Sequence, residues 1–242
     1  MTIWGLTVLD LGALVFFLVA WLGYAPFVGW RGRRLHMVGA AMIDHRRAWM
    51  NELLGRDMKV ADTAIVGHIM STAGFFASTT VIVIGALLGV LVNLTRGGAT
   101  TSTEWLAISP PSSVEIKVVL ILVVAVYAFQ SFTWAIRQAN FAAVLMGAAP
   151  RADTMGAELR ARLAANMGNI ITGVAASYDS GMRAYYFALG ALTWVVSPIL
   201  FFLATVGVVG LLSHRQTRSR TAIALNQIAA ARSEGAEPSQ KT

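Results

Sequence analysis

The sequence predicts an all-α integral membrane protein, a helical bundle that crosses the bilayer several times, and three observations lead to that class. Of 242 residues, 56% are hydrophobic and only 13% are charged, whereas about a quarter of the residues in a soluble domain are charged. Long uncharged stretches recur along the chain, and so little charge cannot cover a globular surface in water. Cysteine is absent. Composition thus excludes an ordinary soluble enzyme domain, a disordered chain and a disulfide-bonded scaffold.

Four stretches are long and apolar enough to cross a bilayer. A hydrocarbon core about 30 Å thick requires roughly 20 mostly apolar residues as helix, because every backbone N–H and C=O must be satisfied within the segment. We expect spans at 3–30, 63–95, 115–146 and 183–213, with Pro198 kinking the last helix rather than ending it. The second and third spans exceed the hydrocarbon thickness, so both are expected to project beyond the bilayer on a shared side.

Two connections between the spans are expected to form amphipathic cytoplasmic helices, at about 35–58 and 153–178. Apolar residues recur every three or four positions in the second of them, and Asp153 can cap its start. Each helix can lie flat in the membrane interface or stand upright against the projecting spans, and the overlong spans favour the upright arrangement. Residues 1–220 thus form a single membrane domain, followed by a polar, flexible tail at 221–242.

The basic residues predict an orientation. The connections after the first and third spans together hold 12 Lys and Arg residues, whereas the second loop and the N-terminus hold two. Cytoplasmic loops carry the excess of Lys and Arg, so the N-terminus is expected outside. With four spans the tail, which adds five basic residues, falls on the outer side. A fifth, re-entrant or missed span would return it to the cytoplasm.

Polar side chains within the spans are the candidates for function, because in lipid they cost free energy unless they face a partner or water. Steps of three and four place those of the third span on one helix face, which is expected to face inward. They form either a polar pathway or hydrogen bonds between helices, in which Arg137 and Asn140 pair with Asp62 or Asp179; the structural role is favoured. The candidates are His68, Ser71, Ser78, Gln130, Thr133, Arg137, Asn140, Asp179 and Arg183.

Gly85 and Gly89 in the second span have the spacing that lets helix backbones approach closely, either between copies or within one chain. Catalytic chemistry is not indicated, because zincin, phosphate-loop and nucleophile-elbow motifs are all missing from the sequence. With no Cys and four His, we expect no catalytic residue, cofactor or metal. The net charge of +7 lies mostly at span ends, where arginines meet anionic head groups, so no nucleic acid is expected as a partner.

Four strings carry a resemblance to a known family. They are Arg-Ala-Trp-Met at 47–50, Phe-Phe-Ala-Ser-Thr-Thr at 75–80, Phe-Thr-Trp at 132–134 with Arg137, Gln138 and Asn140, and Arg-Ala-Tyr-Tyr-Phe-Ala-Leu at 183–189. Together they resemble the bacterial membrane proteins grouped as the "domain of unknown function 599" family, over about residues 6–220. The resemblance implies a multi-pass inner-membrane protein, so the N-terminus that the basic residues place outside is expected in the periplasm, and the resemblance transfers no activity.

Three functions are compatible with these features. The first is a non-enzymatic structural or accessory subunit that packs against membrane lipids and other membrane proteins, as a homo-oligomer or in a larger assembly. The second is a channel or carrier for a small ion, for which a fixed Arg137 favours an anion. The third, an intramembrane enzyme, has only Asp10 and His68 as deep titratable groups. The first is therefore expected.

Overall fold

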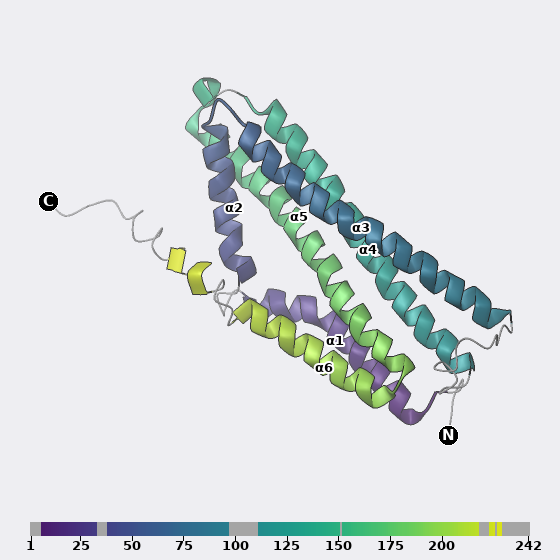
Figure 1. Cartoon of the computed structure of the whole chain (residues 1–242). Coiled ribbons are helices and arrows are strands. Elements are labelled where there is room, and N and C mark those ends of the chain that lie inside the picture. Colours follow the sequence, from purple (N-terminus) through teal and green to yellow (C-terminus); the bar gives the residue numbers. More distant parts are fainter. Residues whose placement is uncertain are drawn as a thin grey trace.

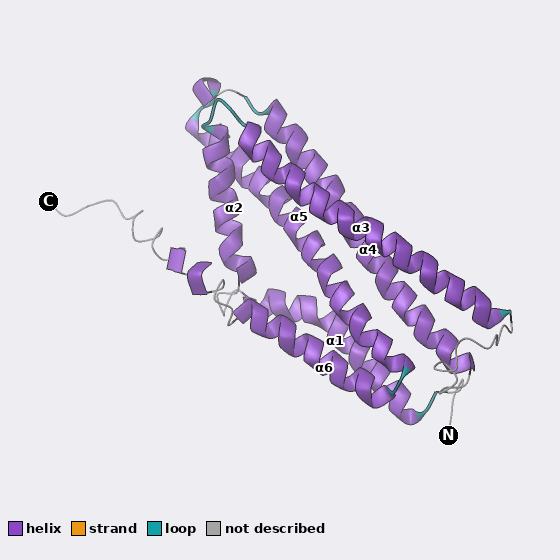
Figure 2. Ribbon diagram, viewed as in Figure 1, coloured by secondary structure: helices purple, strands orange, loops and turns teal. Residues whose placement is uncertain are grey.

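The chain folds into a bundle of long α-helices (Figures 1 and 2). The computed structural model describes residues 6–32, 38–96, 111–150, 152–217, 223–225 and 227–228. The expected tail at 221–242 lies almost wholly outside these ranges. Within these ranges two short 3-10 turns, η2 (Ala152–Thr154) and η3 (Thr193–Val195), join helices. The main helices are α1 (Val8–Gly32), α2 (Val38–Leu54), α3 (Val60–Thr95), α4 (Pro111–Ala148), α5 (Ala157–Leu192) and α6 (Pro198–Thr217).

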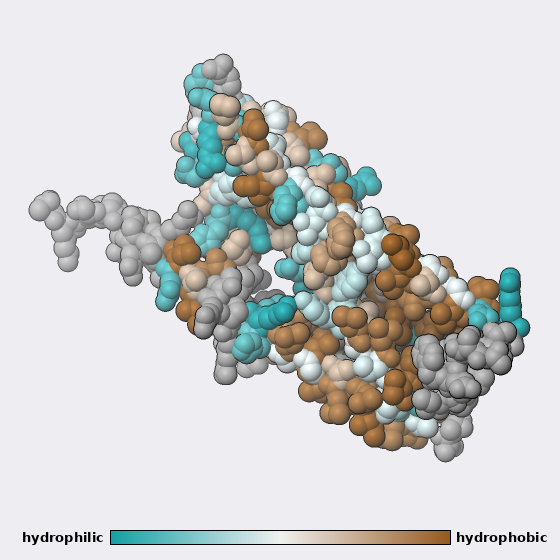
Figure 3. All heavy atoms as spheres, in the orientation of Figure 1, coloured by the Kyte–Doolittle hydropathy of each residue, from teal (hydrophilic) through white to brown (hydrophobic). Residues whose placement is uncertain are grey.

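Four of these helices are long and apolar enough to cross a membrane, which confirms the all-α membrane class. The segments are Val8–Val28, Val60–Thr95, Ser113–Ala148 and Pro198–Gln216. The first three match the expected spans to within a few residues. Apolar side chains dominate the surface around α1 and α6, whereas hydrophilic ones gather around α2 (Figure 3). The surface around α1 and α6 is therefore suited to the hydrocarbon core of a membrane, and the surface around α2 is suited to water.

The fourth span differs from the prediction of one kinked helix. The amphipathic segment and the start of that span are a single helix, α5, which ends at Leu192. The chain then turns at η3 and begins α6 at Pro198. Proline suits the first position of a helix because its missing N–H needs no partner there. The Ser197 hydroxyl accepts a hydrogen bond from the Ile199 N–H at 3.2 Å and caps the new helix.

Helix α6 folds back along the end of α5, so the two form an antiparallel hairpin. A Cβ atom placed on Gly190 of α5 would lie 3.6 Å from the Val208 side chain of α6. Farther from the turn, Arg215 donates a hydrogen bond to the Tyr186 hydroxyl at 2.8 Å. Helix α1 lies beside α6 (Figure 1). The C-terminal end of α6 therefore lies at the end of the bundle where α1 ends and α2 begins.

Two apolar clusters form the core. One is aromatic and joins α1, α4, α5 and α6, and its largest buried rings belong to Phe17, Phe132, Phe187, Trp194 and Phe201. Trp194 and Phe201 stack with their ring centres 4.9 Å apart. The other cluster buries Met50, Leu53 and Leu54 of α2 against α3, α4 and α5. Helix α2 thus packs against the start of α3, the end of α4 and the start of α5, and its upright position relative to the membrane stays a prediction.

Gly181 lets α5 approach α4 closely, which gives a first prediction. A Cβ atom added at Gly181 would lie 2.6 Å from the buried Phe132 ring. Because overpacking a filled core costs about 1–3 kcal/mol, we expect Gly181→Ala to lower the thermal unfolding temperature of the detergent-solubilised protein. Gly207→Ala is the matched control, since no other described helix brings an atom within 4 Å of its Cβ position. Equal unfolding temperatures of the two variants would show that the ring moves aside freely.

Candidate functional site

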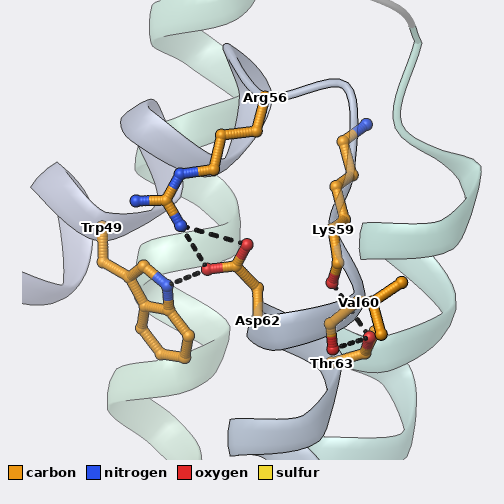
Figure 4. A network of polar contacts seen from close by, with 6 residues as sticks. All are labelled: Trp49, Arg56, Lys59, Val60, Asp62 and Thr63. Atoms are coloured by element: carbon orange, nitrogen blue, oxygen red, sulfur yellow. Dashed lines mark hydrogen bonds and ion pairs between the residues drawn. The ribbon is translucent and has the colours of Figure 1, made fainter.

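Asp62 forms the centre of a polar network where α2 meets α3 (Figure 4). Its carboxylate is buried and accepts hydrogen bonds from the Trp49 indole at 2.7 Å and from Arg56 at 2.9 Å. The expectation that Arg137 or Asn140 pairs with Asp62 is therefore wrong. Trp49 and Arg56 bind Asp62 in place of the expected residues because they lie on the helix and turn that directly precede Asp62 in the chain. With its oxygens occupied by nearby donors, Asp62 is a structural joint between helices rather than an open site.

The polar face of α4 points away from the core. Gln130, Arg137 and Asn140 are exposed, and Thr133 and Asn140 donate hydrogen bonds to carbonyls of their own helix. The spacing does place them on one face, but the expectation that this face points inward is wrong for the single chain. The inward face instead carries small side chains, which allow close contact with α3 and α5. They are Ala128, Ala135, Ala139 and Ala142, all buried.

The candidate residues of α3 are exposed as well. His68, Ser71 and Ser78 lie on the outward side of the helix. Among the described residues, no other helix brings an atom within 4 Å of a Cβ built on Gly85 or Gly89. The inward side is formed by residues such as Val66, Ala73 and Ala77, which are buried. In a single chain, therefore, these α3 residues and the α4 stripe do not line a shared interior path, and a channel function stays a prediction.

Asp179 and Arg183 come together on α5 with Arg46 of α2. Burial raises the pKa of the Asp179 carboxyl, and the neighbouring Arg183 and Arg46 guanidiniums act in the opposite direction. Burial likewise lowers the pKa of Arg46, against the attraction of Asp179. The Arg183 guanidinium donates a hydrogen bond to the Ser180 hydroxyl at 2.7 Å. Asp179 and Arg183 were expected as polar residues at the start of the fourth span, but nothing local to 35–58 distinguished Arg46, which joins them through the packing of α2 on α5.

A second buried carboxylate closes the opposite end of the bundle. Asp10 is 6% exposed and accepts a hydrogen bond from the Trp194 indole at 2.8 Å, besides those from Thr7. The ammonium of Lys117, itself 3% exposed, lies 5.8 Å from the centre of the Trp194 ring. The sequence analysis identified Asp10 as a titratable group within the first span. It did not predict the partners of Asp10 from elsewhere in the chain. This cluster ties the starts of α1 and α4 to η3.

An apolar pocket of about 150 Å³ lies between α3, α4 and α5. Among its lining residues are Ile121, Ala125 and Ala188, and it ends at Thr80 and Tyr185, whose hydroxyls are hydrogen-bonded at 2.8 Å. Gln130 lines a second, more polar pocket against Ser177 and Ser180 of α5. Within the described ranges, no three His, Asp or Glu side chains gather in a way that could hold a metal ion.

Fold and polar clusters together define the class: a multi-pass helical membrane protein whose buried carboxylates hold helices together. A family model described as "Protein of unknown function, DUF599" matches residues 12–221. The chain belongs to this family, as the resemblance of its four strings indicated. No curated protein and no solved structure matches the chain. Family membership therefore adds no activity to what the residues themselves support.

The Asp62 joint gives a second prediction. We expect Asp62→Ala to lower the free energy of unfolding by about 2 kcal/mol, since the Trp49 indole and Arg56 both lose a charged acceptor. Chemical denaturation in detergent, followed by tryptophan fluorescence, measures the change. Asp44→Ala is the control, because Asp44 is exposed on the adjoining helix. If both variants unfold alike, the network does not stabilise the junction.

Proposed function

We propose that this protein is a non-enzymatic protein of the bacterial inner membrane whose copies associate through the outward face of α3. The observation that carries the proposal is a row of small residues along that face. Successive steps of three, four or seven positions place them on one side of the helix. Apart from the adjoining backbone of α3 itself, no atom of the described residues lies within 4 Å of a Cβ built on any of the four glycines. The row consists of Gly67, Ser71, Gly74, Ser78, Gly85 and Gly89.

Small residues matter here because the bilayer supplies no hydrophobic force between helices. Association in lipid depends on close van der Waals contact and on hydrogen bonds, both of which small and hydroxyl side chains permit. In the most apolar stretch of α3 only 11% of residues are buried within the chain, against 33% for α4. Packing within one chain leaves Gly85 and Gly89 uncovered. A second copy provides the contact that the single chain lacks.

We further propose that the chain crosses the membrane five times, with residues 184–197, the uncharged end of α5 and the η3 turn, as a short additional crossing around which the bilayer thins. This stretch is uncharged and packs in the aromatic core between α4 and the α1–α6 pair. Because α6 runs back along it, the tail leaves from the same end as both basic connections. That end then holds 17 of the 19 Lys and Arg residues. The positive-inside rule supports a cytoplasmic location for it and a periplasmic N-terminus.

The α3 interface is tested by placing large side chains where its glycines have none. We expect the double variant Gly85→Leu and Gly89→Leu to dissociate the oligomer, because the added side chains hold the two backbones apart. Light scattering of the protein in lipid nanodiscs or mild detergent reports the mass. Gly207→Leu on α6 is the control, since its Cβ position is equally open. A wild-type particle with the mass of one chain, or a double variant that keeps the oligomeric mass, would contradict the proposal.

The topology is tested by labelling. The chain has no cysteine, so single cysteines can be introduced without removing others. We expect a membrane-impermeant maleimide to label Ser102→Cys in cells whose outer membrane has been permeabilised, and to label Ser219→Cys only after the inner membrane is broken. Five crossings place these two positions on opposite sides of the membrane. Labelling of both cysteines before the inner membrane is broken would instead favour four crossings.

A further inference from the structure

We propose that three arginines at the junction of α2, α5 and α6 bind the phosphate group of an anionic ligand. The arginine cluster consists of Arg46 of α2, Arg183 of α5 and Arg215 of α6. Arg46 and Arg183 both interact electrostatically with Asp179 of α5. Arg215 donates a hydrogen bond to Tyr186, which lies three residues after Arg183 and so on the same side of α5. This inference concerns a different part of the chain from the α3 interface.

Helix α1 also reaches the arginine cluster. The buried Tyr24 of α1 interacts electrostatically with Arg183 of α5 and with Ser213 of α6. Ser213 lies two residues before Arg215. The first two and the last two main helices of the described chain, α1, α2, α5 and α6, therefore converge on this junction. Such convergence holds the guanidinium groups on a framework of packed helices rather than on loops.

The charges of the cluster do not balance. The cluster holds three guanidinium groups, of which Arg46 and Arg183 share one carboxylate neighbour, that of Asp179. Among the described residues no carboxylate oxygen lies within 4 Å of a nitrogen of Arg46, Arg183 or Arg215. Asp44 lies two positions from Arg46, which places it on the opposite side of α2. The junction thus carries an excess of positive charge. Because Arg46 and Arg183 are partly buried, an anion that approaches them is screened less than it would be at an open surface.

The guanidinium groups also have N–H donors that their hydrogen bonds within the chain leave unused. Each has five N–H groups, and the hydrogen bonds to Ser180 and Tyr186 use one donor each on Arg183 and Arg215. Arg215 also lies over the Tyr186 ring, 5.6 Å from its centre, which holds the side chain in place. Arginine matches the oxygens of a phosphate with two parallel hydrogen bonds. Phosphate is therefore the anion that the remaining donors suit best.

The depth of the junction fits a phosphate at the membrane boundary. Tyr24 and Arg215 lie near the ends of the apolar segments Val8–Val28 and Pro198–Gln216. Lipid head groups lie at that level, and basic pockets between helices bind them on the cytoplasmic side. A soluble phosphate or phosphate ester offers the same group to the same donors. Both sources share the chemistry that the arginine cluster recognises.

Native mass spectrometry of the full-length protein in neutral detergent tests the site. The protein is titrated with phosphatidylglycerol or with phosphatidylcholine, and inorganic phosphate is added in a third arm. We expect phosphatidylglycerol to bind more tightly than phosphatidylcholine. Arg46→Gln and Arg183→Gln should each weaken this binding about fivefold, as expected for one basic side chain near an anionic head group. Displacement of the lipid by millimolar inorganic phosphate would support the site and assign it to a soluble phosphate.

Two further variants separate binding from a loss of folding. Asp179→Asn removes the competing carboxylate and should strengthen phosphatidylglycerol binding, a gain that a damaged fold cannot give. Arg162→Gln is the matched control, since Arg162 is an exposed arginine on the same helix. The proposal is overturned if Arg46→Gln and Arg183→Gln bind the lipid as the control does. It is also overturned if phosphatidylcholine binds equally well while inorganic phosphate displaces neither lipid.

Discussion

The whole arrangement depends on how closely α5 can approach its neighbours. This helix lies against α4 along much of its length, against α2 near its start and against α6 near its end. At two of these contacts a side chain would collide with the neighbour: at Gly168 with the backbone of Arg47, and at Gly181 with the Phe132 ring. Protein interiors are close-packed, so such approaches are possible only where the Cβ atom is missing. The two glycines thus set the distances at which α2 and α4 pack.

Each end of the bundle is closed by a hydrogen bond between a tryptophan and a buried aspartate. The Trp49 indole bonds to Asp62 at one end, and the Trp194 indole bonds to Asp10 at the other. A buried carboxylate costs much free energy unless its oxygens accept hydrogen bonds, whereas an indole offers a donor on a large apolar ring. The pair therefore fits places where a helix bundle passes from apolar to polar surroundings. Both acids have their partners within the chain, so their burial reflects helix joining rather than chemistry.

Much of the architecture could be predicted from the sequence, because hydropathy and segment length follow from local composition. The spans of α1, α3 and α4 were found for that reason. The hairpin of α5 and α6 was missed because Pro198 is compatible with both a kink and a helix start. The direction of the α4 stripe was missed because polar residues were expected to avoid lipid, while close packing requires alanines on the inner face. Arg46 could not be found locally, since its neighbours come from α5.

The α3 face and the arginine cluster lie on different elements, and this separation matters for function. Helix α3 packs mainly on α4, whereas the arginines come from α2, α5 and α6. A second copy seated on α3 would therefore leave the arginine cluster uncovered in both copies. Lipid or phosphate binding and self-association then act on different sides of the molecule and need no shared residue. A coupling between them would have to pass through α4 and α5, where Phe132 and Gly181 are in contact.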